Sequence, residues 1–138
     1  MNMMPMGSKA AIYIRTASLP PLDGIAEQYA EAARVIDRYA LNVVGTYRDL
    51  GVSGTITKGR EALERMIADI GPLGINVILV SDVARLSRGG LTRVWALLDL
   101  FREKEARVYV CRDDLFFDTY DQCQVFRDYG APATVGNV

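Results

Sequence analysis

The sequence predicts a single α/β domain with a central, mostly parallel sheet of four to five strands and helices on both faces. Two observations lead to this prediction. Short, continuous apolar segments alternate with amphipathic segments, and no repeat, linker or low-complexity stretch divides the chain of 138 residues. Strands that are apolar throughout are typical of a parallel sheet that helices cover on both sides.

The first half of the chain contains two predicted strands and two predicted helices. Residues 10–14 form a short apolar segment, and residues 24–40 follow with apolar side chains at helical spacing. Residues 42–47 are typical of a second strand. Between residues 60 and 70 the apolar side chains fall again on one helical face, which predicts the second helix.

The second half repeats this alternation. Residues 77–80 are wholly apolar, residues 91–101 carry the clearest helical stripe of the chain, and residues 107–111 are typical of a fourth strand. Asp118 can cap a last helix over residues 119–129. We therefore expect a domain over residues 10–130, a disordered leader over 1–9 and a flexible tail over 131–138.

Composition excludes several classes of function. The chain has no histidine, which excludes acid–base catalysis by histidine and histidine-ligated metals. Cys111 and Cys123 are too few for a disulfide framework and lack the spacing of zinc ligands, so we expect reduced thiols, no metal and no cofactor. No apolar run approaches the roughly 18 residues of a membrane span, and no signal peptide is visible. We predict a cytoplasmic protein without membrane contact.

The charged residues show a marked bias toward arginine. The net charge of −1 and the isoelectric point of about 5.4 exclude a surface that is basic all over. Yet thirteen of the sixteen basic residues are arginine, whose planar fork matches phosphate oxygens. A GC-rich genome would produce the same bias. The positions of the arginines must therefore decide between the two explanations.

Several arginines follow predicted strands, beside small residues. In a parallel α/β sheet, ligands collect beyond the carboxyl ends of the strands. Four arginines could meet over one patch there, namely Arg15, Arg60, Arg85 and Arg88. A phosphate bound between them would offset their mutual repulsion. Alternatively, these arginines form ion pairs with nearby carboxylates, namely Asp49, Asp82, Asp113 and Asp114. Spacing alone leaves both alternatives open.

These segments resemble the catalytic domain of the serine recombinases, the family of resolvases and invertases. The family's first strand reads Tyr-x-Arg-x-Ser, and its start is matched by Tyr13-Ile14-Arg15-Thr16. After the second strand comes Asp-x-x-x-Ser-Gly and then an arginine that opens a helix, matched by Asp49, Ser53, Gly54 and Arg60. After the third strand comes Asp-Arg-Leu-Ser/Gly-Arg, whose last four positions are matched by Arg85-Leu86-Ser87-Arg88. The resemblance runs over about residues 10–114.

The resemblance implies a metal-free phosphoryl transfer, in which a serine hydroxyl attacks a DNA phosphodiester and arginines stabilise the charge on the phosphate. On this pattern the phosphate-binding arginines are Arg15, Arg60, Arg85 and Arg88. Gln28 stands where the family often has a glutamine in the first helix, and with Ser53 it joins the phosphate- or DNA-binding set. The resemblance also implies DNA as a partner, and assembly into a homo-oligomer or with another recombinase.

The departures from the family pattern fall in the site itself. Ala17 occupies the nucleophile position, and Ala84 occupies the aspartate position, which removes a carboxylate that could orient Arg85. Ser18 is the candidate nucleophile if the loop shifts by one residue. In an extended segment, however, Ser18 points away from the face of Arg15, and nearby backbone would then satisfy its hydroxyl.

The segment after residue 114 also departs from the family, which continues into a long helix that dimerises and lies along DNA. Residues 114–138 offer one short helix and a tail without basic character. We therefore expect DNA contact to need a longer chain or a partner subunit, and we expect this chain alone not to cleave DNA.

Three functions remain open. The first is a recombinase catalytic domain, either a fragment of a longer integrase or a degenerate copy with impaired catalysis. The second is a non-catalytic phosphate-binding or interaction module that regulates a recombinase. The third, a flavodoxin-like nucleotide or anion binder, is disfavoured because no glycine-rich phosphate loop follows the first strand.

Overall fold

The computed structural model describes residues 4–16, 24–51, 60–86 and 91–117, with only the backbone of residues 91 and 92. These residues form three α-helices, one short 3₁₀ helix and five strands. In chain order they are β1 (Lys9–Thr16), α1 (Ile25–Tyr39), β2 (Asn42–Leu50), α2 (Glu61–Leu73), β3 (Val77–Val80), η1 (Val83–Arg85), α3 (Leu91–Glu103), β4 (Arg107–Val110) and β5 (Leu115–Phe116). The predicted helix over 119–129, Cys123 and the predicted tail lie outside the described residues.

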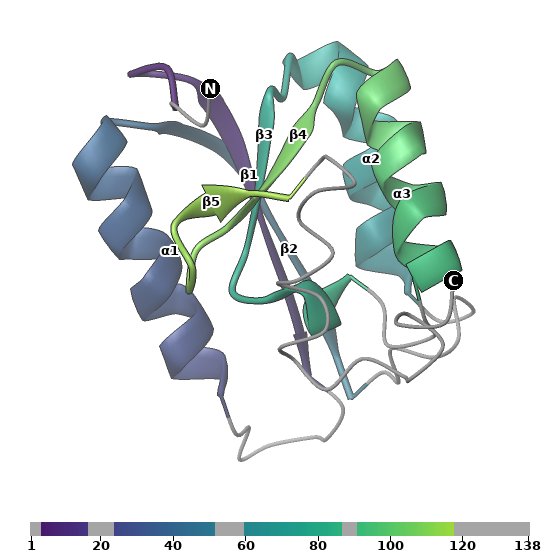
Figure 1. The fold of residues 1–138 in the computed structure, drawn as a ribbon, viewed down its shortest axis with the longest axis horizontal. Coiled ribbons are helices and arrows are strands. Elements are labelled where there is room, and N and C mark those ends of the chain that lie inside the picture. Colours follow the sequence, from purple (N-terminus) through teal and green to yellow (C-terminus); the bar gives the residue numbers. More distant parts are fainter. Residues whose placement is uncertain (1–3, 17–23, 52–59, 87–90, 118–138) are drawn as a thin grey trace.

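The strands form one five-stranded sheet in the order β2-β1-β3-β4-β5 (Figure 1). The four strands predicted from the sequence are β1 to β4, and all of them run parallel. β5 pairs with β4 in the antiparallel sense. The predicted fold class, a mostly parallel sheet of four to five strands in one α/β domain, is therefore confirmed.

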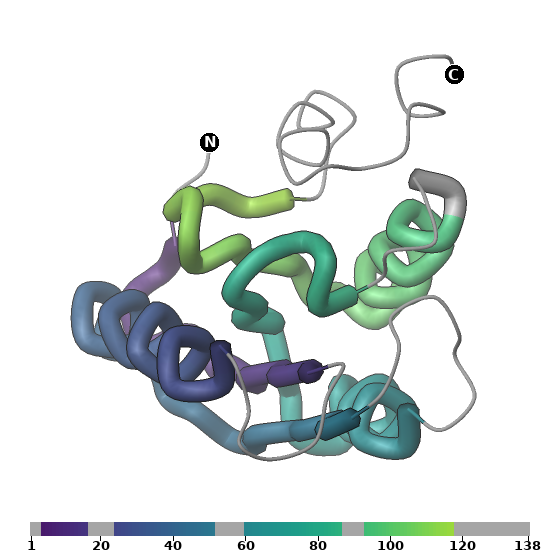
Figure 2. Tube along the Cα trace, turned by 90° about the horizontal axis from the view of Figure 1, so that it is seen from below, coloured from purple at the N-terminus to yellow at the C-terminus, as the bar shows by residue number. Residues whose placement is uncertain are grey.

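Helices cover both faces of the sheet, which gives three layers (Figure 2). On one face, α1 packs its Ala32 and Val35 against Ile12 and Ile14 of β1. On the opposite face, α2 and α3 enclose a second core that includes Tyr13 of β1. Because successive side chains of a strand point to opposite faces, β1 supplies both cores. All residues of β3 are buried, as its continuous apolar sequence predicts.

β1 and β2 extend beyond their predicted ends. The pairing continues through Arg15 opposite Asp49 and Thr16 opposite Leu50. A polar or charged residue usually marks the end of a buried strand, but here Arg15, Thr16 and Asp49 are themselves buried. They are tolerated because hydrogen bonds satisfy them inside the domain. The extension brings both strand ends to the same edge of the sheet.

Residues 4–9, which the sequence analysis assigned to the leader, contact the domain in the structure. Met4 is buried in the core beneath α1, and the Gly7 N–H donates to the Tyr39 carbonyl over 3.0 Å. Ser8 accepts from the Asn42 N–H at 2.9 Å, and β1 begins at Lys9. The apolar Met4 side chain and these backbone bonds fix the segment against the end of α1.

Two further features concern the helices and Cys111. None of the helices in the described ranges is long and apolar enough to cross a bilayer. Cys111 is a free, buried thiol, and burial raises its pKa to about 12. It therefore stays a protonated thiol at neutral pH.

Candidate functional site

The candidate site lies at the carboxyl ends of β1 and β3, where the strand order of the sheet reverses. From β1 the chain passes through α1 to β2 on one side, and it then returns through α2 to β3 on the other side. Ligands of doubly wound sheets bind at such a switch point. Arg15 ends β1 there, and η1 follows β3.

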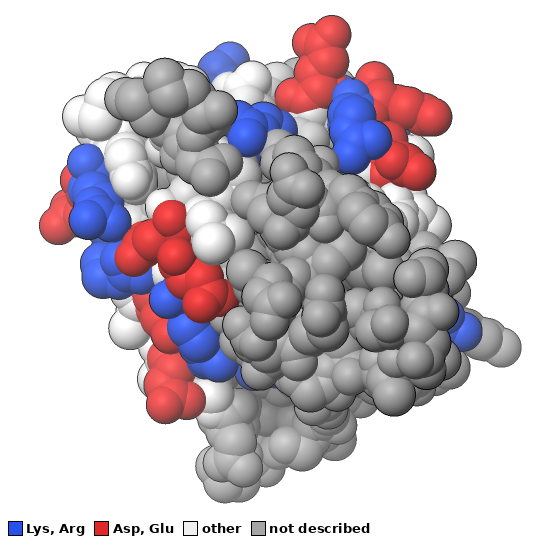
Figure 3. Space-filling model, viewed as in Figure 1, with Lys and Arg blue, Asp and Glu red and all other residues white. Residues whose placement is uncertain are grey.

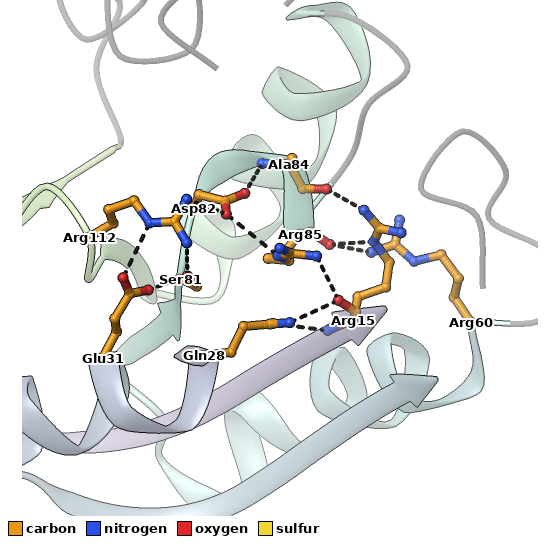
Figure 4. A network of polar contacts seen from close by, with 9 residues as sticks. All are labelled: Arg15, Gln28, Glu31, Arg60, Ser81, Asp82, Ala84, Arg85 and Arg112. Atoms are coloured by element: carbon orange, nitrogen blue, oxygen red, sulfur yellow. Dashed lines mark hydrogen bonds and ion pairs between the residues drawn. The ribbon is translucent and has the colours of Figure 1, made fainter. Parts of the chain in front are cut away.

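Arg15 and Arg60 hold three successive carbonyls, those of Ala84, Arg85 and Leu86. Figure 4 shows the bonds to the first two. Arg15 donates from Nη2 to the Ala84 carbonyl over 2.7 Å and from Nε to the Arg85 carbonyl over 3.2 Å. Arg60 donates to the carbonyls of Arg85, over 3.0 Å, and Leu86, over 2.7 Å. Only 2% of Arg15 and 1% of Arg60 is exposed. The two guanidinium groups thus fix the backbone of η1 from inside the domain.

Arg85 differs from these two arginines in its surroundings. Its Nη1 donates to the Arg15 carbonyl over 3.0 Å, and its Nε lies 3.5 Å from Asp82 Oδ2. Its side chain is 22% exposed. Arg85 therefore reaches the surface at the end of β1, while Arg15 and Arg60 do not.

Asp82 supplies the carboxylate that the sequence analysis found missing at Ala84. Its Oδ1 accepts from the Ala84 N–H at 2.9 Å, which caps η1, and its Oδ2 faces Arg85. A carboxylate thus lies next to Arg85 although Ala84 carries none. The physical reason is the 3₁₀ turn, which brings side chains three residues apart onto the same side.

Gln28 joins α1 to the end of β1. Its Oε1 accepts from the Arg15 N–H at 3.4 Å, and its Nε2 donates to the Arg15 carbonyl over 3.2 Å. The buried amide of Gln28 thus bonds to both the N–H and the carbonyl of Arg15, as the backbone of a neighbouring strand would. In the structure Gln28 contacts the backbone of Arg15, so its effect on the site is through the placement of that residue.

Comparison with known proteins identifies the family. The sequence model of the resolvase N-terminal domain matches residues 10–128, which is most of the chain. The chain belongs to the resolvase family. The resemblance that the sequence predicts is thereby confirmed, and the match assigns the chain to the domains of site-specific recombination. No curated protein matches the chain.

Solved structures agree with this assignment. The N-terminal catalytic domain of TP901-1 integrase is 25% identical, with a TM-score of 0.69 over 90% of this chain and 92% of that chain. A resolvase family site-specific recombinase from Streptococcus pneumoniae is 21% identical, with a TM-score of 0.72 over 89% of this chain and 85% of that chain. The C-terminal catalytic domain of ISC1926 TnpA, an IS607-like serine recombinase, is 21% identical, with a TM-score of 0.66 over 88% of this chain and 77% of that chain. The last two show the shared fold.

Behind the arginines, the resolvase domain contains a buried pair that sequence reasoning missed. The Tyr13 hydroxyl donates to Asp49 Oδ2 over 2.8 Å and accepts from Arg60 Nη2 at 2.9 Å. Burial raises the pKa of Tyr13 well above its ordinary value, although Arg60 opposes the shift. Tyr13 therefore stays a neutral phenol that can donate to Asp49. The Tyr-x-Arg spacing was the available signal, but it gave no role to the tyrosine.

Asp49 caps α2 from a neighbouring strand. Its two carboxylate oxygens accept from the N–H groups of Ala62, at 2.9 Å, and Leu63, at 3.0 Å. The residue at the usual capping position, Arg60, makes no side-chain cap. Local rules for helix caps look within a few residues of the helix start, so they could not find a cap that lies on β2.

Tyr13→Phe is expected to lower the free energy of unfolding by about 1–3 kcal/mol, because it leaves buried donors of Arg60 and an oxygen of Asp49 without their partner. Urea unfolding at neutral pH measures this change. Tyr29→Phe on the exposed part of α1 is the matched control and is expected to change little. A Tyr13→Phe variant as stable as the wild type would contradict the role of the hydroxyl.

The structure brings together part of the predicted site. Arg15, Arg60 and Arg85 meet, and Gln28 lies beside Arg15. Ser18, Ser53 and Arg88, together with Ala17, lie outside the described residues. The alternative prediction paired these arginines with carboxylates. In the described part of the chain, only one of the predicted pairs is present, between Arg85 and Asp82. The main partners of Arg15 and Arg60 that the structure describes are backbone carbonyls, which neither alternative had named.

Proposed function

We propose that this resolvase domain acts in site-specific DNA recombination by binding a DNA phosphate at the carboxyl ends of β1 and β3. The observation that carries the proposal is the meeting of Arg15, Arg60 and Arg85, from three separate segments, at the switch point of the sheet. A cluster of guanidinium groups at this position suits a phosphate. We include Arg88 and Ser53 in the proposed site, as the family pattern implies.

The charge of the domain indicates weak binding to DNA by the domain alone. On the face shown in Figure 3, basic and acidic side chains are interspersed over the described surface. With a net charge of −1, the chain gains little from counterion release on DNA. We therefore propose that a longer chain or a partner subunit supplies the grip on DNA, in a homo-oligomer or with another recombinase, in the cytoplasm.

The test is the salt dependence of DNA binding. Fluorescence anisotropy of a short labelled duplex gives the slope of log K against log salt concentration. Arg85→Gln is expected to weaken binding and to reduce the slope by about 0.9, the value for one lost phosphate contact. Arg102→Gln, an exposed arginine of α3 paired with Asp99, is the control and should leave the slope unchanged. Equal slopes for Arg85→Gln and the wild type would contradict phosphate binding at this site.

A second function, that of a non-catalytic module that regulates a recombinase, is favoured by one sequence observation. Ala17 stands at the nucleophile position and carries no oxygen that could attack phosphorus. On this view the arginine site binds a phosphate without cutting the strand, and the domain acts by pairing with an active recombinase. Cleavage assays separate the two functions.

A further inference from the structure

We propose that Arg112, just after β4, is a positioning residue that fixes η1 through Asp82 and does not itself contact DNA. Arg112 is not one of the arginines of the candidate site. Its side chain joins α1 to the segment between β3 and η1 (Figure 4). The inference rests on the proposed function, because the placement of η1 affects recombination only if DNA binds at the carboxyl ends of β1 and β3.

The first argument is that all three nitrogens of the Arg112 guanidinium group have acceptors. Nε donates to Glu31 Oε2 over 3.2 Å, Nη2 donates to the Ser81 hydroxyl over 3.3 Å, and Nη1 lies 3.3 Å from Asp82 Oδ2. The Ser81 hydroxyl in turn donates to Glu31 Oε1, which closes a ring of hydrogen bonds. Because the fork is planar, contacts on three sides fix its orientation.

The second argument is that the backbone holds Arg112 and Asp82 close together. The Cys111 N–H donates to the Val80 carbonyl over 2.8 Å, and the Arg112 N–H donates to the Ser81 carbonyl over 3.1 Å. The pairing of β3 with β4 therefore continues past the ends of both strands. The Arg112 side chain is 42% exposed, whereas that of Asp82 is 5% exposed. The fork thus reaches from the surface to a buried carboxylate.

Asp82 transmits this contact to η1. Its Oδ1 accepts from the Ala84 N–H at 2.9 Å, which caps η1. A buried carboxylate requires a cation or hydrogen-bond donors, and Oδ2 of Asp82 faces two cations, Arg112 Nη1 at 3.3 Å and Arg85 Nε at 3.5 Å. Arg85 Nε makes no hydrogen bond within the described residues. Arg112 is therefore the nearer cation that keeps Asp82 in its capping position.

The surroundings of Arg112 disfavour a direct contact with DNA. Two carboxylates, those of Glu31 and Asp82, face its fork and would repel a phosphate there. A phosphate that displaced them would also leave the buried Asp82 carboxylate without its nearer cation. Arg112 therefore affects DNA binding through the placement of η1, without adding a phosphate contact.

The experiment is amide hydrogen exchange of the ¹⁵N-labelled chain, followed by NMR without DNA. Arg112→Gln is expected to speed the exchange of the Ala84 amide about fivefold, as the loss of a helix cap would, and to shift the Arg85 Nε–Hε resonance. Arg38→Gln on α1 is the matched control, because Arg38 is 54% exposed and its partner Asp114 keeps Arg34. The control is expected to change neither signal. If folded Arg112→Gln gives the same two signals as Arg38→Gln, the positioning role is refuted.

Two milder variants test the same contacts if Arg112→Gln does not fold. Glu31→Gln removes the charge that holds Arg112 Nε but keeps an oxygen for the hydrogen bonds. Arg112→Lys keeps the charge but not the fork, so it can face only one carboxylate closely. We expect both to speed the exchange of the Ala84 amide, by less than Arg112→Gln does. Wild-type exchange in both variants would also refute the positioning role.

DNA binding distinguishes a positioning residue from a phosphate contact. In the anisotropy assay, Arg112→Gln is expected to weaken binding several-fold more than Arg38→Gln, which removes the same charge, with an unchanged salt slope. A slope reduced by about 0.9 would make Arg112 a phosphate contact and would overturn the inference. Faster exchange of the Ala84 amide with unchanged DNA binding would also overturn it. An unchanged slope in Arg85→Gln contradicts the proposed function instead, and the exchange data then still decide whether Arg112 fixes η1.

Discussion

The purified chain of 138 residues is expected to leave supercoiled plasmid DNA uncut, and Ala17→Ser alone is expected not to give rapid cleavage. The wild type has no oxygen at the nucleophile position, and the loss of a nucleophile costs several orders of magnitude in rate. Ala17→Ser restores only that oxygen. With a net charge of −1 the chain alone gains little from counterion release on DNA, so the substrate would seldom reach the restored hydroxyl.

Agarose gels of supercoiled, nicked and linear plasmid measure this prediction, and denaturing gels detect a covalent protein–DNA adduct on a nicked substrate. Ser18→Ala is the control, because Ser18 is the alternative nucleophile. Nicking by the wild type that disappears in Ser18→Ala would contradict the prediction. In that case the loop after Arg15 is shifted by one residue, and the chain is a recombinase with Ser18 as its nucleophile.

The strands were predictable where burial alone determines them. Residues 77–80 are continuously apolar, and β3 spans the predicted residues. The ends of β1 and β2 were not predictable in the same way, because Arg15 and Asp49 are charged. Whether a charged residue ends a strand depends on partners from elsewhere in the chain. Here the partners are the carbonyls of η1 for Arg15 and the amides of α2 for Asp49.

The sequence could place the arginines together and could name Asp82 as a possible ion-pair partner, but it could not name the backbone partners of Arg15 and Arg60. Parallel strands bring their carboxyl ends to one edge of the sheet, so the convergence of Arg15 and Arg85 follows from the strand assignment. Backbone carbonyls have no sequence signature, so the bonds of Arg15 and Arg60 to residues 84–86 could not be predicted. Position-by-position comparison with the family also missed Asp82, because its carboxylate acts from three residues before Arg85.

Asp49 is the residue whose loss is expected to cost the most stability among the described polar residues. It is 5% exposed, and its carboxylate accepts from two N–H groups of α2 and from the Tyr13 hydroxyl. Asp49→Ala removes a helix cap, worth about 1 kcal/mol. It also leaves a buried phenol without its acceptor, at a further cost of about 1–3 kcal/mol.

We therefore expect Asp49→Ala to lower the free energy of unfolding by about 3 kcal/mol, measured by urea unfolding at neutral pH. Asp49→Asn keeps one oxygen that can accept from α2, so its loss should be about half as large. Asp99→Ala, whose side chain is 62% exposed and paired with Arg102, is the matched control; surface ion pairs are worth about 0–1 kcal/mol. If the free energy of unfolding of Asp49→Ala equals that of Asp99→Ala, the N–H groups of α2 and the Tyr13 hydroxyl find other acceptors. The arrangement of the arginine site would then not depend on the buried Asp49 carboxylate.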